Sequence, residues 1–160
     1  MPAPDSYTPL PWQPEVAWVA CDLVHEDAEL KHGPRNVLRK AIAHLAEAGY
    51  VLKTGVEVEF FVLDASSEPG TGSKLSDPLD LQAKPCYDAH ALMRRYELIS
   101  ELLENMEALG WGPYQADHED ANGQFEINWD YADCLTTADR VTFFKYMVGR
   151  LACVHTIAIT

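Results

Sequence analysis

The sequence predicts an α+β fold in which helices cover one side of a mostly antiparallel sheet. Three observations lead to this prediction. Strand-like and helical segments alternate along the chain, the clearest strand segments carry apolar residues at every second position, and an Asn-Gly turn joins the last strand pair. The chain has 160 residues, of which 48% are hydrophobic and 23% charged, so it can bury one core or one core and part of another.

The first half of the chain contains two predicted strands and one helix. Residues 1–14 are rich in proline and are expected to be extended. A strand is predicted over residues 17–24. A helix is predicted from Pro34, which suits a first turn, to a stop at Gly49. Residues 55–64, which are rich in Val and Phe, form the next predicted strand.

A loop separates the two halves of the chain. Residues 65–85 are rich in Gly, Ser and Pro, and we expect a loop or flap there. Within it, residues 70–74 read Gly-Thr-Gly-Ser-Lys. They lack the Gly-Lys pair that follows four intervening residues in a phosphate-binding P-loop, so this motif is excluded.

The second half predicts a helix, a strand pair and a final helix. Apolar residues recur at helical spacing over residues 89–109, and Gly110 ends that helix. Strands are predicted over residues 112–117 and 124–130. The last helix is expected to begin near residues 136–137, where two threonines offer a cap.

Composition excludes several classes of protein. The formal net charge is −13 and no basic stripe is present, so a nucleic-acid partner is not expected. The apolar stretches are too short to span a bilayer, and the first residues lack the basic and apolar regions of a secretory signal, so we expect a cytoplasmic protein with no membrane partner. The four cysteines are scattered. Free thiols in a reducing compartment explain them better than a zinc site does.

The strand over residues 55–64 places two carboxylates together. Side chains alternate between the faces of a strand, so Glu57 and Glu59 share one face with Phe61 and Leu63. Like charges beside an aromatic neighbour are costly to ionise, and a cation between them removes that cost. A strand with one solvated face is the alternative, but it leaves the two apolar residues exposed.

The strand over residues 124–130 repeats this pattern. Its polar face carries Gln124, Glu126, Asn128 and Asp130, and Glu119 and Asp120 precede the turn. Carboxylates on two such strands predict an oxygen-ligand site for Mg²⁺ or Mn²⁺. An EF-hand loop is excluded, because aligning its glycine with Gly123 puts Trp129 where a glutamate ligand is required. His118, beside Glu119, is expected to be a polar or packing residue and not a ligand of this site.

These segments resemble the glutamine synthetase family. Gly-Val-Glu-Val-Glu-Phe-Phe is similar to its first metal-binding strand, and His-Glu-Asp-Ala-Asn-Gly-Gln-Phe-Glu-Ile-Asn-Trp is similar to its second signature. The residues that flank the two signatures are most similar to the bacterial type III or GlnT-like branch, and this resemblance extends over roughly residues 12–148. The resemblance implies a ligase that joins glutamate to ammonia through a γ-glutamyl phosphate, using ATP and two Mg²⁺ or Mn²⁺ ions per site, in a homo-oligomeric ring.

The resemblance also implies roles for individual residues. Glu59, Glu119 and Glu126 would hold the cation nearer the amino-acid substrate, and Glu57 would belong to the cation that faces the nucleotide. Glu119 would also act in catalysis by helping to bind the ammonium ion. Glu59, Glu119 and Tyr87 would line the substrate site.

The resemblance covers only part of such an enzyme. We expect residues 1–28 to be the remnant of an N-terminal β-grasp domain and residues 29–160 to be the first part of the catalytic domain. The later metal ligands and phosphate-binding arginines are absent, so this chain alone is expected to be inactive. Residues 149–160 fit either a frameshifted terminus or an ordinary buried strand. Two alternatives remain: a ligase that uses another amine, such as methylamine, and a non-catalytic acidic module that binds metal.

Overall fold

The computed structural model describes residues 1–66 and 72–160. The start of the predicted Gly-Thr-Gly-Ser-Lys segment therefore lies outside the described residues. The chain divides into two compact units. The first comprises Met1–Val56 and Tyr131–Phe143, and the second comprises Glu57–Asp130 and Phe144–Thr160. Helices and antiparallel strand pairs occur in the described residues, so the α+β prediction is confirmed.

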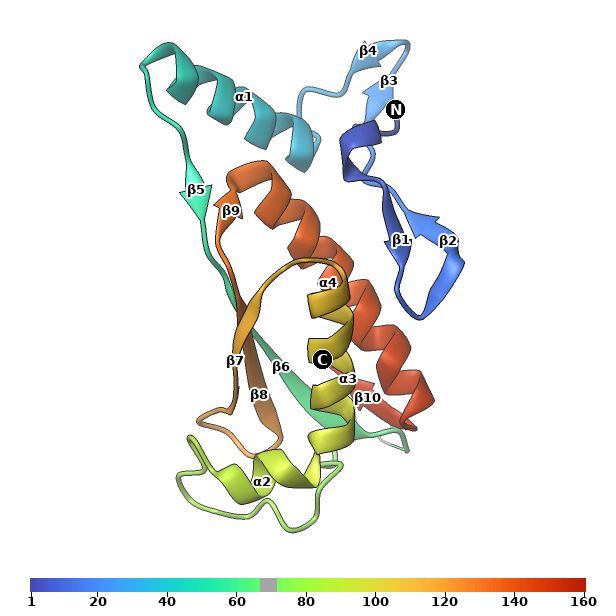
Figure 1. Ribbon diagram of the computed structural model, residues 1–160, viewed down its shortest axis with the longest axis vertical. Coiled ribbons are helices and arrows are strands. Elements are labelled where there is room, and N and C mark those ends of the chain that lie inside the picture. The colour runs from blue at the N-terminus through green and yellow to red at the C-terminus, as the bar shows by residue number, and fades with distance from the viewer. Residues whose placement is uncertain (67–71) are drawn as a thin grey trace. The chain divides into compact units, whose positions relative to one another are not determined.

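The first unit consists of short antiparallel strand pairs, one complete helix and the start of another. Strand β1 (Thr8–Leu10) pairs with β2 (Gln13–Trp18), β3 (Val24–His25) pairs with β4 (Ala28–Glu29), and β5 (Lys53–Thr54) pairs with β9 (Ala132–Asp133). A 3-10 turn, η1 (Pro4–Ser6), precedes β1 (Figure 1). Helix α1 (Pro34–Glu47) begins at the predicted proline, and Gly49 follows its end with φ of 82°.

The strand predicted over residues 17–24 is wrong for most of its length, because β2 ends at Trp18. The chain turns away to deliver Asp22 to Arg35, which lies 2.5 Å from it and 3.0 Å from Asp139. The two carboxylates raise the pKa of Arg35, Asp139 more than Asp22. A regular strand would not place Asp22 against this guanidinium, so side-chain pairing overrides the β propensity of the segment.

Helix α4 (Cys134–Val154) starts earlier than predicted. Asp133, not a threonine, caps it: its carboxylate accepts from the backbone N–H of Thr136 at 3.2 Å and from the hydroxyl of the same residue at 2.6 Å. These hydrogen bonds lower the pKa of Asp133. Thr137 instead donates from its hydroxyl to the carbonyl of Thr54. The predicted cap at residues 136–137 is therefore wrong by one turn.

The second unit is built on a four-stranded antiparallel sheet in the order β10-β6-β8-β7. Its strands are β6 (Glu57–Asp64), β7 (Pro113–His118), β8 (Gln124–Trp129) and β10 (Ile157–Ile159). Two helices, α2 (Ala89–Arg94) and α3 (Tyr96–Ala108), connect β6 to β7. Strands β6, β7 and β8 match the predicted positions to within two residues.

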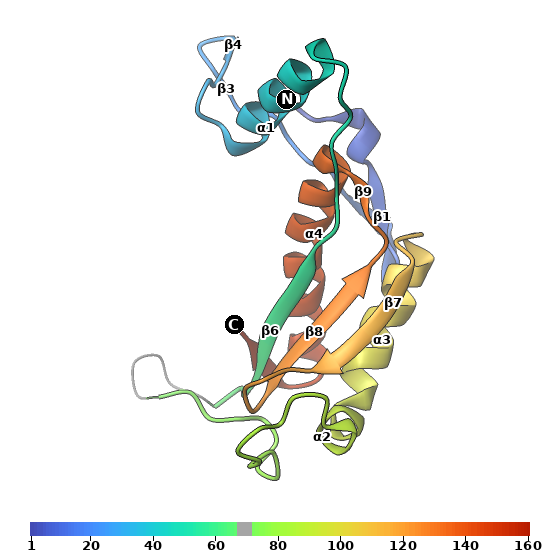
Figure 2. The ribbon, with the colours of Figure 1, turned by 90° about the vertical axis from the view of Figure 1, so that its left-hand side faces the viewer.

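The core of this unit lies between the sheet and the helices. Phe60, Phe125, Ile127 and Trp129 point to the covered face and are each at most 4% exposed. The ring of Phe144 in α4 lies 6.0 Å from that of Phe60 and 5.4 Å from that of Trp129. Figure 2 shows α3 and this part of α4 behind the same face of the sheet. Helices on one side are thus confirmed, and the other face carries the predicted carboxylates.

The helix predicted over residues 89–109 is two helices. Arg95 breaks it, with φ of −115° and ψ of 16°. Asp88 caps α2 by accepting from the backbone N–H of His90, and Arg94 is held by Asp77 at 2.6 Å. These polar contacts fix α2 to the preceding loop, and α3 begins afresh at Tyr96.

Residues 149–160 form regular structure. Helix α4 continues to Val154, with Leu151 and Ala152 buried. Strand β10 then pairs with β6, placing Ile157 opposite Asp64. In the described part of the chain, no helix is both long and apolar enough to cross a membrane.

Candidate cation and substrate site

The open face of the sheet carries a row of carboxylates. Glu59 on β6 is the cross-strand partner of Glu126 on β8, and Asp117 on β7 is the partner of Glu126 from the other side. Directly paired residues in a sheet lie on the same face, so the three side chains project together. In the next row, Asn128 lies between Glu57 and Gln115. The predicted ligands on β6 and β8 therefore share one surface.

Glu119 extends this row at the end of β7. Its backbone N–H donates to the carbonyl of Gln124 at 2.9 Å, so the ladder continues past the strand. Its carboxylate accepts from the backbone N–H of Asp120 at 3.2 Å. Side-chain amides of the same face bind two neighbouring carboxylates: Gln124 donates to Glu59, and Gln115 donates to Asp117.

Glu126 is the carboxylate of this face whose pKa is raised by burial and by its neighbours. Burial raises its pKa, and a hydrogen bond with Asn128 opposes that rise only in part. Three further carboxylates add to the rise by repulsion: Glu119, Glu57 and Glu59. The other three glutamates that the sequence singled out thus all raise the pKa of Glu126. Their mutual repulsion is the condition that a divalent cation relieves.

The donor set fits a hard divalent cation. Carboxylate and amide oxygens are the ligands that Mg²⁺ and Mn²⁺ prefer. Asn128 is 5% exposed, and its side-chain oxygen is buried without a hydrogen-bond partner among the described residues. An unpaired buried acceptor is costly unless something electropositive approaches it. An oxygen-lined face with such an acceptor suits a cation or its bound water.

Tyr87 lies at the edge of this face in a strained conformation. Its φ is 61°, a value that non-glycine residues seldom adopt, and its backbone N–H donates to the carbonyl of His118 at 2.8 Å. The neighbouring Cys86 and then Glu119 raise the pKa of its phenol by repulsion. The exposed ring therefore lies close enough to Glu119 for that carboxylate to raise its pKa.

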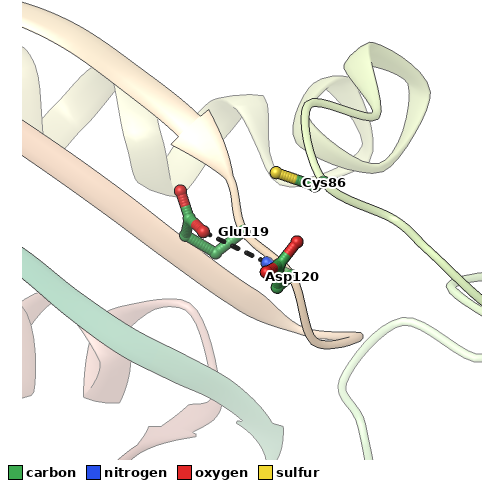
Figure 3. A group of neighbouring side chains, drawn as sticks. All are labelled: Cys86, Glu119 and Asp120. Atoms are coloured by element: carbon green, nitrogen blue, oxygen red, sulfur yellow. Dashed lines mark hydrogen bonds between the residues drawn. The ribbon is translucent and has the colours of Figure 1, made fainter.

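The structure adds Cys86 to the site, which the sequence did not indicate. Figure 3 shows Cys86 on the segment before α2, facing Glu119 and Asp120 on the connection between β7 and β8. One ligand atom of each lies within 4.8 Å of the others. Burial, followed by a hydrogen bond to Asp120, raises the pKa of the Cys86 thiol. No spacing rule links a single cysteine to residues so distant in the chain, so only the fold reveals this neighbour.

His118 lies beneath the site and is fully buried. Its ring bonds Asp80 at 2.7 Å and the backbone carbonyl of Glu119 at 2.9 Å. Its position next to Glu119 in the sequence is the one feature that points to a role for this histidine. No sequence pattern points to its partner Asp80, because Asp80 lies in the loop of residues 65–85.

Comparisons with known proteins find relatives over most of the chain. Residues 31–160 match the family model described as "Glutamine synthetase, catalytic domain". A glutamine synthetase of Rhizobium meliloti (strain 1021) is 49% identical over 160 residues, which is 100% of this chain and 36% of the relative. A glutamate--methylamine ligase of Methyloversatilis universalis is 40% identical over 144 residues, which is 89% of this chain and 32% of the relative.

Solved structures give the same result. The structure of a GmaS/ADP complex superimposes with a TM-score of 0.93 at 51% identity, covering 100% of this chain and 36% of that one. A more distant structure, described as a novel glutamine synthase homolog, shares the fold with a TM-score of 0.79 at 18% identity. The chain thus spans about a third of the length of the relatives it matches. From the matched model and these relatives, the chain belongs to the glutamine synthetase family.

Proposed function

We propose that this chain is part of an ATP-dependent glutamate–ammonia ligase, which makes glutamine through a γ-glutamyl phosphate. The observation that carries the proposal is the row of carboxylates around Glu126. This row lies on the open face of the four-stranded sheet. Glutamate, ammonia and ATP are the proposed substrates, and a homo-oligomeric ring is the proposed assembly of the complete enzyme. In this assignment, residues 1–28 belong to an N-terminal β-grasp domain and residues 29–160 to the catalytic domain.

The proposed role of each glutamate depends on its position along the carboxylate row. Glu59, Glu119 and Glu126 hold the cation nearer the amino-acid substrate. In support, Glu59 and Glu126 are cross-strand partners, and Glu119 raises the pKa of Glu126 by repulsion. Glu57 lies one row away, opposite Asn128, and serves the nucleotide-side cation. The cations supply positive charge that stabilises phosphate oxygens during phosphoryl transfer.

Glu119 and Tyr87 are the proposed substrate residues on the other edge. The carboxylate of Glu119 is half-buried among like charges, which favours an ammonium ion as much as a metal ion. The strained backbone of Tyr87 places its ring beside Glu119, and Glu59 completes the substrate-facing set.

A ligase for another amine is the second candidate, supported by the 40% identity to a glutamate--methylamine ligase. A chimera separates the two. Residues 1–160 replace the matching segment of the 49% identical glutamine synthetase, and the product is assayed with ammonia and with methylamine. Glutamine as the main product supports the first proposal, γ-glutamylmethylamide the second, and loss of both in a folded chimera supports a non-catalytic module.

The cation site is tested on the chain itself. Titration with Mn²⁺, followed by water proton relaxation, should show a site that Glu126→Gln weakens. Glu104→Gln is the matched control, because it removes the same charge from an exposed position on α3. Equal binding by both variants would exclude the carboxylate row as the metal site.

A further inference from the structure

A buried carboxylate, Asp80, fastens the loop before α2 to the connection between β7 and β8. We call residues 77–88 the clamp segment and residues 119–123 the tip. Asp80 is 1% exposed and accepts three hydrogen bonds. The donors are His118 Nε2 at 2.7 Å, Asn122 Nδ2 at 2.9 Å and the backbone N–H of Gly123 at 2.5 Å. All three lie in or next to the tip, so one carboxylate organises it.

The tip is shaped around this carboxylate. Gly123 has φ of 75°, and a Cβ there would meet Leu75 at 2.8 Å, so no other residue allows the same backbone without displacement. Figure 2 shows the segment before α2 passing beneath the tip. The backbone N–H of Tyr87 donates to the carbonyl of His118, which adds a second link between clamp segment and tip.

His118 transmits the position of Asp80 to Glu119. Its Nδ1 faces the backbone carbonyl of Glu119 at 2.9 Å, and its Nε2 faces Asp80. A carbonyl oxygen only accepts, so Nδ1 must donate. Burial opposes ionisation of Asp80, but hydrogen bonds from Asn122, His118 and Gly123 lower its pKa, so it also only accepts. His118 thus bridges the Asp80 carboxylate and the backbone of Glu119.

Stability alone explains such a pair poorly. Polar groups lose their hydration when they are buried, and replacing both partners of a buried hydrogen bond by apolar groups of the same shape is often nearly neutral or stabilising. The rings of His118 and Phe125 meet edge to face, with 5.0 Å between their centroids, so the surroundings already suit an apolar side chain. What an apolar residue does not provide is three directed bonds that fix the backbone beside Glu119.

We propose that Asp80 is a positioning residue for the cation site: through His118 and Gly123 it sets the tip so that Glu119 joins the carboxylate row. The proposal rests on the proposed function for the role of Glu119. Its effect resembles that of groups that orient metal ligands from behind, whose loss typically weakens metal binding about 10–100-fold. Tyr87 and Cys86 are set by the same clamp, since both belong to the clamp segment.

The first test measures the tip in the metal-free chain. Asp80→Asn removes the charge while keeping the shape, and amide hydrogen exchange followed by NMR should accelerate about tenfold at Gly123 and Tyr87, whose bonds depend on the clamp. Asp77→Asn is the matched control. Asp77 is a buried carboxylate of the same segment, but it binds Arg94 and the N–H of Leu79 and no residue of the tip.

The second test measures Mn²⁺ affinity by water proton relaxation. Asp80→Asn should weaken binding about tenfold or more, whereas Asp77→Asn should change it by about twofold at most. Wild-type affinity in Asp80→Asn would overturn the proposal. The double variant with His118→Gln should lose no more than Asp80→Asn alone, because the two residues act as one unit, and additive losses would also overturn it.

The outcomes separate the two proposals. If the wild-type chain binds no Mn²⁺, the proposed cation site fails, and exchange at Gly123 and Tyr87 still decides whether Asp80 holds the tip. If Asp80→Asn does not fold, Asn122→Ala replaces it. This variant removes one of the three donors and leaves the bond between Asp80 and His118, so it should weaken Mn²⁺ binding about threefold, within the spread for one lost hydrogen bond. No change in affinity or in exchange at the tip would reject the proposal.

Discussion

Glu59 and Glu126 are direct cross-strand partners on the open face of the sheet, on the side away from the helices. Hydrophobic packing of Phe60 and Phe125 on the opposite face fixes this register, because a slip of one residue would bury the carboxylates and expose the aromatic rings. The core thereby holds two like charges side by side. The predictions below follow from the cost of that arrangement and from the contacts that sustain it.

Replacing Glu126 by Gln should stabilise the metal-free chain at neutral pH. The pKa of Glu126 is raised in the folded state, so the folded state holds its proton more tightly than the unfolded state does. The ionised carboxylate therefore destabilises the fold above the raised pKa, and this penalty disappears as pH falls through that value. Thermal denaturation in EDTA should show a higher midpoint for Glu126→Gln at pH 7. The difference should vanish near pH 4, about the ordinary pKa of a glutamate. A lower midpoint at pH 7 would contradict the argument.

Mn²⁺ should make the wild-type chain more thermally stable than Glu126→Gln, which is the reverse of their order without metal. A ligand that binds only the folded state stabilises it in proportion to the logarithm of its concentration relative to Kd. Wild type should gain thermal stability on adding Mn²⁺, and Glu126→Gln should gain little. Mg²⁺ should stabilise wild type less than Mn²⁺, because it demands nearly ideal octahedral geometry. Equal gains in both proteins would place the bound ion elsewhere.

Removing the cap of α4 should destabilise the chain in a pH-dependent manner. Asp133→Ala loses the bonds to Thr136 and should cost about 1 kcal/mol in the free energy of unfolding at pH 7. The folded-state pKa of Asp133 is lowered, so its contribution is present above the unfolded value and is lost as pH falls through the folded value. Urea unfolding at pH 7 and at about pH 3 checks this, since the cost should shrink at the lower pH. Thr137→Ala, which leaves the cap intact, is the comparison.

The sequence predicts the sheet and its polar face well because a strand of period two exposes its pattern directly. Val58, Phe60 and Val62 alternate with Glu57 and Glu59, and the same alternation in β8 completes the row. Prediction from the sequence fails where a side chain contacts residues that are distant along the chain. Asp22 leaves the predicted strand to meet Arg35, and Asp80 meets His118 from a loop without any pattern. Cys86 joins Glu119 for the same reason.

Truncating Phe144 should be among the most damaging changes in the second unit. Its ring is 1% exposed and contacts those of Phe60 and Trp129. Loss of a buried aromatic ring leaves a cavity, so Phe144→Ala should cost about 3–5 kcal/mol. Tyr114→Ala, at a position 65% exposed, should change stability by about 0.5 kcal/mol or less. Chemical denaturation of both variants checks the contrast, and similar losses would contradict the assigned core.

The isolated 160-residue chain should not catalyse γ-glutamyl transfer. Phosphoryl transfer spreads negative charge over several oxygens, and the loss of groups that stabilise it typically costs orders of magnitude in rate. In the proposed assignment, Glu59, Glu119 and Glu126 serve one cation and Glu57 serves the other, and the chain spans 36% of the length of the 49% identical synthetase. Arg35 and Arg94 are occupied by aspartates, so neither is free to contact phosphate. The assay combines glutamate, hydroxylamine, ATP and Mn²⁺ and measures γ-glutamyl hydroxamate. Background levels are expected. Product that disappears in Glu126→Ala would show that the second cation and the remaining length of the relatives are dispensable for the reaction.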